Sequence, residues 1–185
     1  MIVIVGESAS GKTTLVNDLI KKHPEFHKIV TYTTRPKRDN EVEGIDYYFV
    51  SEEKFKSLVE QDYFVEHAKY RDWSYGTAKK DCVKDKNAIV ILTPAGMRSL
   101  KKINKKATSI YVYVDRRSRL INILLRGDNV DEAYRRNLSD LGQFDGITNE
   151  VDYVIDNTQF HMNEDEVLKC LEAILKIGDN NVKTF

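Results

Sequence analysis

The sequence has few of the residues that define fibrous, low-complexity and disulfide-rich proteins. Its 185 residues include only 9 glycines, 3 prolines and 2 cysteines. So little glycine and proline argues against a collagen-like or disordered chain. Cys82 and Cys170 lie far apart in the sequence, and neither has a partner at metal-ligand spacing. We expect two reduced thiols, which are typical of a cytoplasmic protein.

The sequence also lacks long hydrophobic runs and an excess of charge of one sign. Its longest apolar runs, such as Ile110 to Val114, have the length of a strand, whereas a membrane-spanning helix needs about 20 residues. The 29 lysines and arginines balance 29 aspartates and glutamates, so bulk electrostatics does not favour binding to nucleic acid. The first residues carry no export signal. We expect a soluble cytoplasmic protein with no membrane or nucleic-acid partner, and its oligomeric state stays open.

The hydrophobic pattern predicts an α/β fold with a parallel sheet. Short β-branched apolar segments, typical of strands covered on both faces, lie at residues 2–5, 88–92, 110–114 and 151–155. Residues 12–22 have a helical period that ends at His23-Pro24. A second helical pattern follows Asn163, a suitable cap, and ends near Gly178. Alternating strands and helices over this length predict a single three-layer domain spanning residues 1–185.

Two stretches interrupt this alternation. Residues 31–86 are polar, aromatic and rich in turns, and residues 116–140 hold many arginines and few strand signals. We interpret the first as a binding insertion and the second as a lid, both over the carboxyl ends of the strands, where open α/β sheets bind ligands. The predicted core then comprises residues 1–30, 87–115 and 141–185.

Residues 6–13 match the phosphate-loop pattern G-x-x-x-x-G-K-[ST], directly after a predicted strand and before a predicted helix. The two glycines let backbone N–H groups turn toward a phosphate, and Lys12 can reach the β- and γ-phosphates. The Thr13 hydroxyl is the expected Mg²⁺ ligand. The predicted ATP-binding residues are Gly6, Glu7, Ser8, Ala9, Ser10, Gly11, Lys12, Thr13 and Thr14. The loop by itself predicts a nucleoside triphosphate ligand and no particular reaction.

Several motifs after the loop narrow the class. They are Thr33-Thr34-Arg35 with Arg38, Asp46-Tyr47 with Phe49, Phe64 with Glu66, and Tyr75-Gly76-Thr77. In this order and at these spacings, they resemble the guanylate kinase family of P-loop nucleoside monophosphate kinases. The resemblance implies a P-loop NTPase fold with a monophosphate-binding insertion and an arginine-rich lid. It also implies transfer of the γ-phosphoryl group of ATP to GMP or dGMP, with Mg²⁺.

The resemblance assigns roles to residues of the insertion. Arg35, Arg38, Tyr47 and Tyr75 are expected to grip the acceptor phosphate, Glu66 and Thr77 to read the guanine edge, and Thr31 to add a third base contact. Guanidinium forks and phenol hydroxyls hold a phosphate in fixed geometry. A carboxylate suits guanine because it accepts from N1–H and N2–H₂ together.

Six arginines lie between positions 116 and 136: Arg116, Arg117, Arg119, Arg126, Arg135 and Arg136. A mobile arginine that closes over the transferred phosphoryl group can accelerate its transfer. The resemblance identifies Arg126 as the lid arginine and either Arg136 or Arg135 as the second, and Asn157 as a residue near the adenine of ATP.

The sequence departs from the family at the end of the predicted strand of residues 88–92. It has Ile91 and Thr93 where the family has the aspartates of an L-D-x-D pattern, and Asn122 where a companion arginine is common. This departure leaves acceptor specificity open. One alternative is a related kinase that acts on another nucleotide or small phosphate compound. The other is a non-catalytic guanylate kinase-like binding module, which the intact phosphate loop disfavours.

Overall fold

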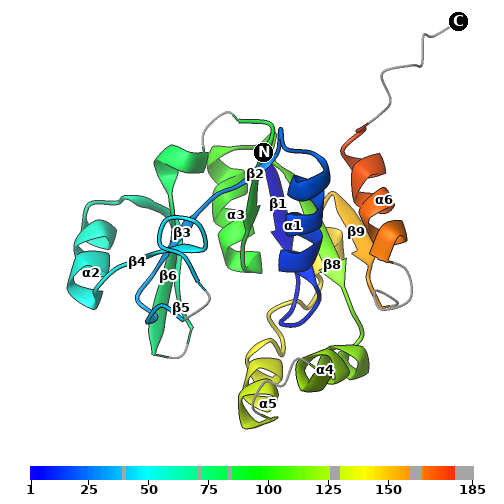
Figure 1. The fold of residues 1–185 in the computed structure, drawn as a ribbon. Helices are drawn as coiled ribbons and strands as arrows, with labels where there is room; N and C mark the ends of the chain where they lie inside the picture. The colour runs from blue at the N-terminus through cyan, green and yellow to red at the C-terminus, as the bar shows by residue number, and fades with distance from the viewer. Residues whose placement is uncertain (39–40, 71, 83–84, 126–129, 159–163, 178–185) are drawn as a thin grey trace, which may run out of the picture. The chain divides into compact units, whose positions relative to one another are not determined.

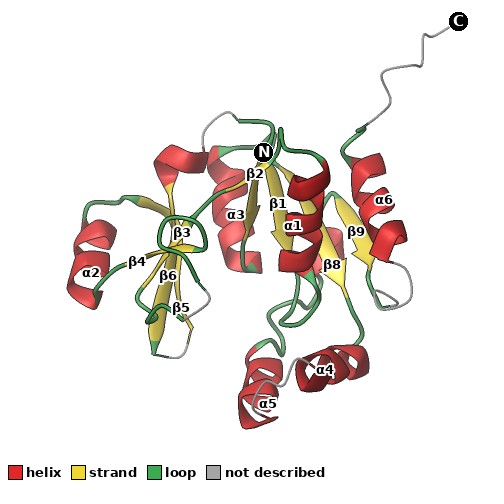
Figure 2. Ribbon diagram, in the orientation of Figure 1, coloured by secondary structure: helices red, strands yellow, loops and turns green. Residues whose placement is uncertain are grey.

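The structure is a computed structural model that describes residues 1–38, 41–70, 72–82, 85–125, 130–158 and 164–177. Strands and helices alternate along these residues (Figure 1), and Figure 2 distinguishes them by type. The strands are β1 (Ile2–Val5), β2 (His27–Lys28), β3 (Thr31–Thr33), β4 (Tyr47–Phe49), β5 (Phe64–Tyr70), β6 (Trp73–Ala78), β7 (Ala88–Ile91), β8 (Thr108–Tyr113) and β9 (Tyr153–Asp156). The helices are α1 (Lys12–Lys22), α2 (Glu52–Glu60), α3 (Pro94–Ile103), α4 (Arg116–Leu125), α5 (Val130–Ser139) and α6 (Glu164–Ile174), with short 3₁₀ helices at η1 (Lys79–Cys82) and η2 (Ile147–Asn149).

The larger sheet has the strand order β2-β7-β1-β8-β9. β2 pairs with β7 in parallel, with His27 opposite Ala88, and β8 pairs with β9 in parallel, with Ile110 opposite Tyr153. The predicted α/β fold with a parallel sheet is confirmed, and the four predicted strands are β1, β7, β8 and β9. β2 was not predicted because two residues are too few to show a hydrophobic period.

The chain divides into two compact units. The first unit contains residues 1–3 and 27–108, and the second contains residues 4–26 and 109–185. The phosphate loop lies in the second unit, whereas the arginine, tyrosine and glutamate motifs of residues 31–86 lie in the first.

The first unit contains a smaller sheet with the order β4-β3-β6-β5. Helix α2 lies beside this sheet (Figure 1), and Phe55 and Leu58 of the helix pack with Phe64 of β5 in a buried cluster. Ser51 starts α2 by accepting a hydrogen bond from the amide of Lys54. This sheet and α2 form the body of the stretch that the sequence identified as an insertion.

In the second unit, α1 begins directly after the phosphate loop and covers the predicted residues 12–22. Leu15, Val16 and Leu19 are its buried stripe, as the period indicates. The predicted C-terminal helix is α6, while its predicted cap Asn163 and terminator Gly178 lie outside the described residues.

The arginine-rich segment forms α4 and α5, which lie side by side in the second unit (Figure 1). Its lack of strand signals therefore reflects two helices, with residues 126–129 outside the described ranges. None of the helices in the described ranges has the length and apolar character needed to cross a bilayer.

A cluster of charged groups joins the end of α1 to α6. Glu172 Oε1 accepts hydrogen bonds from Lys22 Nζ at 2.8 Å and from the His23 ring at 2.7 Å. The bonds from Lys22 and His23 hold the pKa of Glu172 below its ordinary value. This pairing stabilises the contact between two helices that lie far apart in the sequence.

Glu172→Gln is expected to lower Tm at pH 7 by roughly 1–3 °C, because it removes a partly exposed ion pair. A lowered carboxyl pKa stabilises the fold above about pH 4.3, and this contribution is lost as the pH falls through the folded pKa. Thermal melts between pH 3 and pH 7 should therefore converge for the two proteins at low pH. Glu166→Gln, on an exposed position of the same helix, is the control, and a constant Tm difference at all pH values would contradict this account.

Candidate active site

The loop between β1 and α1 leaves no space for a side chain at its two glycines. A Cβ on Gly6 would lie 2.6 Å from the carbonyl oxygen of Val112, and a Cβ on Gly11 would lie 2.6 Å from Nδ2 of Asn157. Gly11 also has a φ of +83°, which other residues rarely adopt. Asn157 Nδ2 donates to the carbonyl oxygen of Ser10 at 2.9 Å. These contacts hold the loop against β8 and the residue that follows β9.

The Lys12 ammonium lies against the backbone of the same loop. Its Nζ donates to the carbonyl oxygen of Glu7 at 2.6 Å and to Oγ of Ser10 at 3.2 Å. Thr13 and Thr14 are exposed in the first turn of α1, at the positive end of the helix dipole. A cation, a helix N-terminus and a glycine-bounded loop together suit a polyphosphate ligand.

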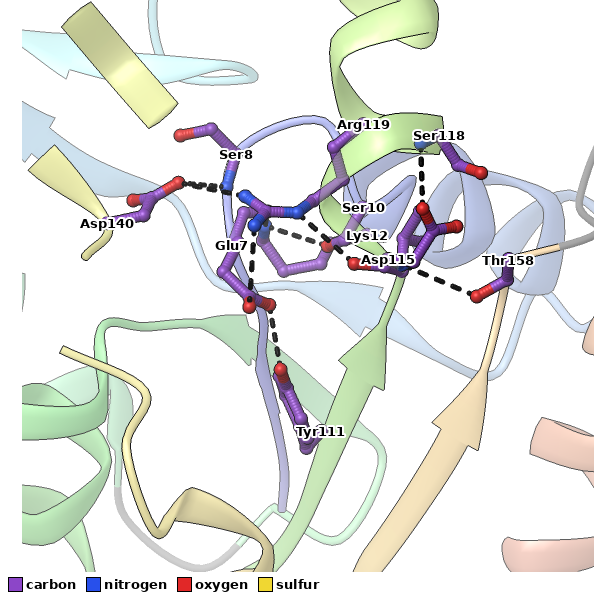
Figure 3. A network of polar contacts seen from close by, with 11 residues as sticks. Glu7, Ser8, Ser10, Lys12, Tyr111, Asp115, Ser118, Arg119, Asp140 and Thr158 are labelled. Carbon is purple, nitrogen blue, oxygen red and sulfur yellow. Dashed lines mark hydrogen bonds and ion pairs between the residues drawn. The ribbon is translucent and has the colours of Figure 1, made fainter. Parts of the chain in front are cut away.

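A charged network extends from this loop to α4 and to Asp140, the residue that follows α5 (Figure 3). The hydroxyl of Tyr111 donates to Oε2 of Glu7 at 2.9 Å, and Oε1 of Glu7 lies 3.8 Å from Nη2 of Arg119. Nη1 of Arg119 lies 3.7 Å from Oδ2 of Asp140, which accepts from the backbone amide of Ser8 at 2.7 Å. Burial, and then the neighbouring Glu7 carboxylate, raises the pKa of Tyr111. The phenol therefore stays a neutral donor to Glu7.

The start of α4 places Arg119 in this network. Asp115 accepts an amide hydrogen bond in the first turn of α4 at 3.0 Å, and Nε of Arg119 donates to the carbonyl oxygen of Val114 at 3.2 Å. One turn further along α4, Nδ2 of Asn122 donates to the carbonyl oxygen of Ala9 at 3.2 Å. Helix α4 is thus connected directly to the phosphate loop.

In the first unit, the structure gathers the predicted phosphate-gripping residues around a buried arginine. Arg35 is 6% exposed, and its Nη2 donates to Oε1 of Glu41 at 2.5 Å. Its guanidinium carbon lies 5.5 Å from the ring centroid of Tyr47, whose ring centroid lies 6.0 Å from that of Tyr75. Thr31 stands opposite Tyr47 in the β3–β4 pair. A guanidinium beside two phenols provides the donors that an anion requires.

Glu41 balances the positive charge at this place. Its Oε2 accepts from the backbone amide of Arg38 at 2.9 Å, while the Arg38 side chain is exposed. Burial opposes ionisation of Glu41, but the hydrogen bonds from Arg35 and Arg38 outweigh it and hold the Glu41 pKa below its ordinary value. The carboxylate therefore remains ionised next to Arg35 and balances the charge of its guanidinium.

Glu66 and Thr77 meet on the β5–β6 pair, where they stand opposite one another. The Thr77 hydroxyl donates to Oε1 of Glu66 at 2.8 Å. Gly96 makes room for the carboxylate, because a Cβ there would lie 3.0 Å from Oε2. Burial raises the pKa of Glu66, and the bond from Thr77 only partly opposes this. A partly buried carboxylate with one hydrogen-bonded oxygen has the capacity to accept further hydrogen bonds.

Thr93, which stands where an aspartate was expected, begins α3. Its hydroxyl accepts from the backbone amide of Gly96 at 3.1 Å, and Pro94 occupies the first helical position. The side chain of Thr93 thus satisfies the helix terminus and adds no charge near Glu66.

The predicted site residues form two groups, one in each unit. Arg35, Tyr47, Tyr75 and Thr31 lie together, with Glu66 paired to Thr77 in the same unit, and the loop residues lie with Asn157 in the other. Arg126 lies outside the described residues. Arg136 lies in α5, but its side chain is not described, whereas Arg135 is exposed. The roles predicted for these residues stay predictions.

Sequence reasoning did not identify four residues that shape these groups. In the sequence, Tyr111 is one residue of a predicted strand and Arg119 is one of six clustered arginines, and neither pattern indicates a buried polar contact. Asp140 and Gly96 carried no signal at all, since each acts on a residue far away in the sequence. The clustering of arginines was the one indication, and it did not distinguish a buried side chain from an exposed one.

A phosphate loop between a buried strand of a parallel sheet and a helix defines the class of P-loop proteins, which bind nucleoside triphosphates. The model of the family described as guanylate kinase matches residues 1–176. The chain therefore belongs to the guanylate kinase family, and the resemblance drawn from the sequence is confirmed.

Individual relatives agree with this assignment. The chain is 33% identical to a guanylate kinase of Nostoc sp. over 180 residues, covering 95% of this chain and 88% of the relative. It is 28% identical to a guanylate kinase of Clostridioides difficile over 192 residues, covering 100% of this chain and 91% of the relative. The crystal structure of guanylate kinase from Anaplasma phagocytophilum has a similar fold, with a TM-score of 0.68, 24% identity, and coverage of 95% of this chain and 84% of that one.

Gly11→Ala is expected to weaken binding of ATP and ADP by about tenfold or more, because a Cβ meets Asn157 at a strained backbone angle. Isothermal titration calorimetry measures the loss. Gly146→Ala is the matched control, since its φ is +73° but nothing lies within 4 Å of an added Cβ. If Gly11→Ala binds both nucleotides as the parent does, the loop is not held by the contact with Asn157.

Proposed function

We propose that this protein is an ATP-dependent guanylate kinase that transfers the γ-phosphoryl group of ATP to GMP or dGMP. The observation that carries this proposal is the Glu66–Thr77 pair, held at 2.8 Å in the same unit as the buried Arg35. A carboxylate accepts from N1–H and N2–H₂ of guanine together, and adenine offers no such pair of donors. Family membership of residues 1–176 supports the same activity.

The acceptor phosphate is proposed to bind Arg35, Arg38, Tyr47 and Tyr75. Arg35 already holds an anion, because the Glu41 carboxylate contacts it at 2.5 Å. A phosphate dianion carries more charge than this carboxylate and accepts several hydrogen bonds at once. Thr31, in register with Tyr47, is proposed as a further contact of the base.

The donor is proposed to bind the phosphate loop from Gly6 to Thr14, with Lys12 on its β- and γ-phosphates. Oδ1 of Asn157 is buried and has no hydrogen-bond partner among the described residues, so it suits the amino group of adenine. Arg126 and Arg136 are proposed to neutralise charge on the transferred phosphoryl group. Transfer then needs no side-chain nucleophile, since the rate acceleration comes from positioning of the two nucleotides and neutralisation of the phosphate charge.

Mg²⁺ is proposed as the metal, with Thr13 as its protein ligand. The exposed hydroxyl of Thr13 fits this ion, because Mg²⁺ bound with a nucleotide takes most of its ligands from phosphates and waters. When bound, the ion would offset negative charge on the phosphates.

The buried Cys82 and the exposed Cys170 are free thiols, in keeping with the cytoplasmic location that we propose.

A second candidate function is phosphorylation of a different acceptor by a kinase of the same family. Thr93 favours it, because this side chain caps α3 and contributes no carboxylate beside Glu66. A non-catalytic binding module is the remaining alternative, and it does not account for the intact loop and the ordered Lys12.

ADP release in the presence of ATP, Mg²⁺ and a panel of nucleoside monophosphates distinguishes these functions. GMP and dGMP are expected to be the preferred acceptors, and Lys12→Ala is expected to lower kcat by about 100-fold or more. Lys21→Ala, exposed on the same helix, serves as the control. Preference for another acceptor would support the second candidate, and no turnover with any acceptor would support the binding module.

Glu66→Gln is expected to raise KM for GMP by roughly 10- to 100-fold while leaving KM for ATP unchanged. The raised pKa of Glu66 means that its base-reading, ionised form is lost at a pH above the ordinary value of about 4.3. KM for GMP should thus rise as the pH falls, and this rise should disappear in the variant. Because folding disfavours the buried charge, the variant should melt no lower than the parent at pH 7. An unchanged KM for GMP would remove Glu66 from the base site.

A further inference from the structure

We propose that Arg119 and the backbone amide of Ser8 form a binding site for the terminal phosphate of the donor nucleotide, and that the Asp140 carboxylate, which contacts both groups, competes with that phosphate. The inference rests on the proposed function in one respect, since it takes ATP as the donor. It concerns groups of the second unit alone and assigns roles to two residues outside the predicted site.

The Arg119 guanidinium is buried and poorly satisfied. The residue is 7% exposed, and its Nε donates a hydrogen bond at 3.2 Å to the carbonyl oxygen of Val114. Among the described residues this is the one hydrogen bond of the guanidinium, and its Nη1 has no hydrogen-bond partner there. The nearest carboxylate oxygens, on Glu7 and Asp140, lie at 3.8 Å and 3.7 Å. Burying a cation with unmet donors is costly, so this geometry indicates a site for a further anion.

The Asp140 carboxylate marks where that anion would lie. Its Oδ2 accepts from the Ser8 amide at 2.7 Å and faces Nη1 of Arg119 at 3.7 Å. Figure 3 shows the guanidinium between Glu7 on one side and Asp140 with Ser8 on the other. A loop amide and a guanidinium therefore converge on one negatively charged oxygen.

The position of this site along the loop points to the terminal phosphate. Amides at the start of α1 cradle the α- and β-phosphates, and the loop lysine reaches the β- and γ-phosphates. Lys12 Nζ lies 2.6 Å from the carbonyl oxygen of Glu7, the residue immediately before Ser8. The Ser8 amide belongs to the same peptide group as this carbonyl, so it lies in the part of the loop that the lysine marks as the γ-phosphate end, while its N–H points away from the Lys12 ammonium toward Asp140.

A phosphate oxygen fits these donors better than the Asp140 carboxylate does. Hydrogen bonds between charged groups are normally 2.7–2.9 Å long, whereas Asp140 stands 3.7 Å from Nη1 of Arg119. Glu7 cannot follow a ligand, because Tyr111 holds its Oε2 at 2.9 Å within the core. Glu7 therefore orients the guanidinium, while Asp140 is the partner that a phosphate displaces.

The test compares ATP with ADP, which lacks the terminal phosphate. Asp140→Asn removes the competing charge and keeps the shape of the side chain. It is expected to tighten binding of Mg²⁺–ATP by about tenfold and to change binding of ADP by less than about twofold. Isothermal titration without any acceptor gives both affinities. Asp145→Asn, an exposed position in the same unit, controls for loss of one negative charge.

Arg119→Lys provides the second variant, since it keeps the positive charge that Glu7 needs and removes the guanidinium fork. It is expected to weaken Mg²⁺–ATP binding by about tenfold with little effect on ADP. A purely structural role for Arg119 would change Tm and affect both nucleotides equally. Equal changes for ATP and ADP in both variants, or none, overturn the inference.

The outcome is separable from that of the proposed function. If the parent protein phosphorylates GMP but the variants do not alter the ratio of ATP to ADP affinity, the inference alone is wrong. If the variants alter that ratio as expected but no monophosphate is phosphorylated, the Arg119 site stands and the acceptor assignment fails.

Discussion

The structure depends on a loop whose carbonyl oxygens are held by hydrogen bonds from side chains of other segments. A phosphate needs several N–H groups to point the same way, an arrangement that a free loop would lose to its own entropy. Here Asn157 holds Ser10, Asn122 holds Ala9, and Gly6 lies directly against the carbonyl oxygen of Val112. The first two contacts are hydrogen bonds to backbone carbonyl oxygens of the loop, and the third is a close approach to the Cα of Gly6. The anion-binding side is therefore organised by contacts with the carbonyl oxygens on the opposite side of the loop.

Both units place a buried arginine beside a carboxylate. Arg35 is paired directly to Glu41, whereas Arg119 stands between Glu7 and Asp140 at longer range. A guanidinium cannot lose its proton, so burial requires a compensating charge. The carboxylates keep the arginines folded into position, and an incoming phosphate must offer a better set of hydrogen bonds than they do.

Glu66 is the opposite case, a partly buried carboxylate with no cation beside it among the described residues. Its pKa is raised by burial, so the ionised form of Glu66 lowers the stability of the folded protein. Gly96 makes space for the carboxylate and donates no hydrogen bond to it. With Thr93 engaged at the start of α3, its side chain adds no negative charge to the base site proposed at Glu66. Groups held at a cost to stability are common where ligands bind, because the ligand supplies the missing donors.

The sequence alone determined the phosphate loop, helix α1, the four strands β1, β7, β8 and β9, and the order of the acceptor motifs. These features depend on residues that are neighbours in the chain, where spacing sets backbone geometry and hydrophobic period directly. Only the tertiary structure decided that Arg119 is buried while Arg135 is exposed, that Asp140 contacts Ser8, and that Gly96 makes room for Glu66. Each of these facts concerns two segments brought together by packing. The spacing of residues in the sequence does not predict such contacts, because they depend on how the intervening strands and helices pack.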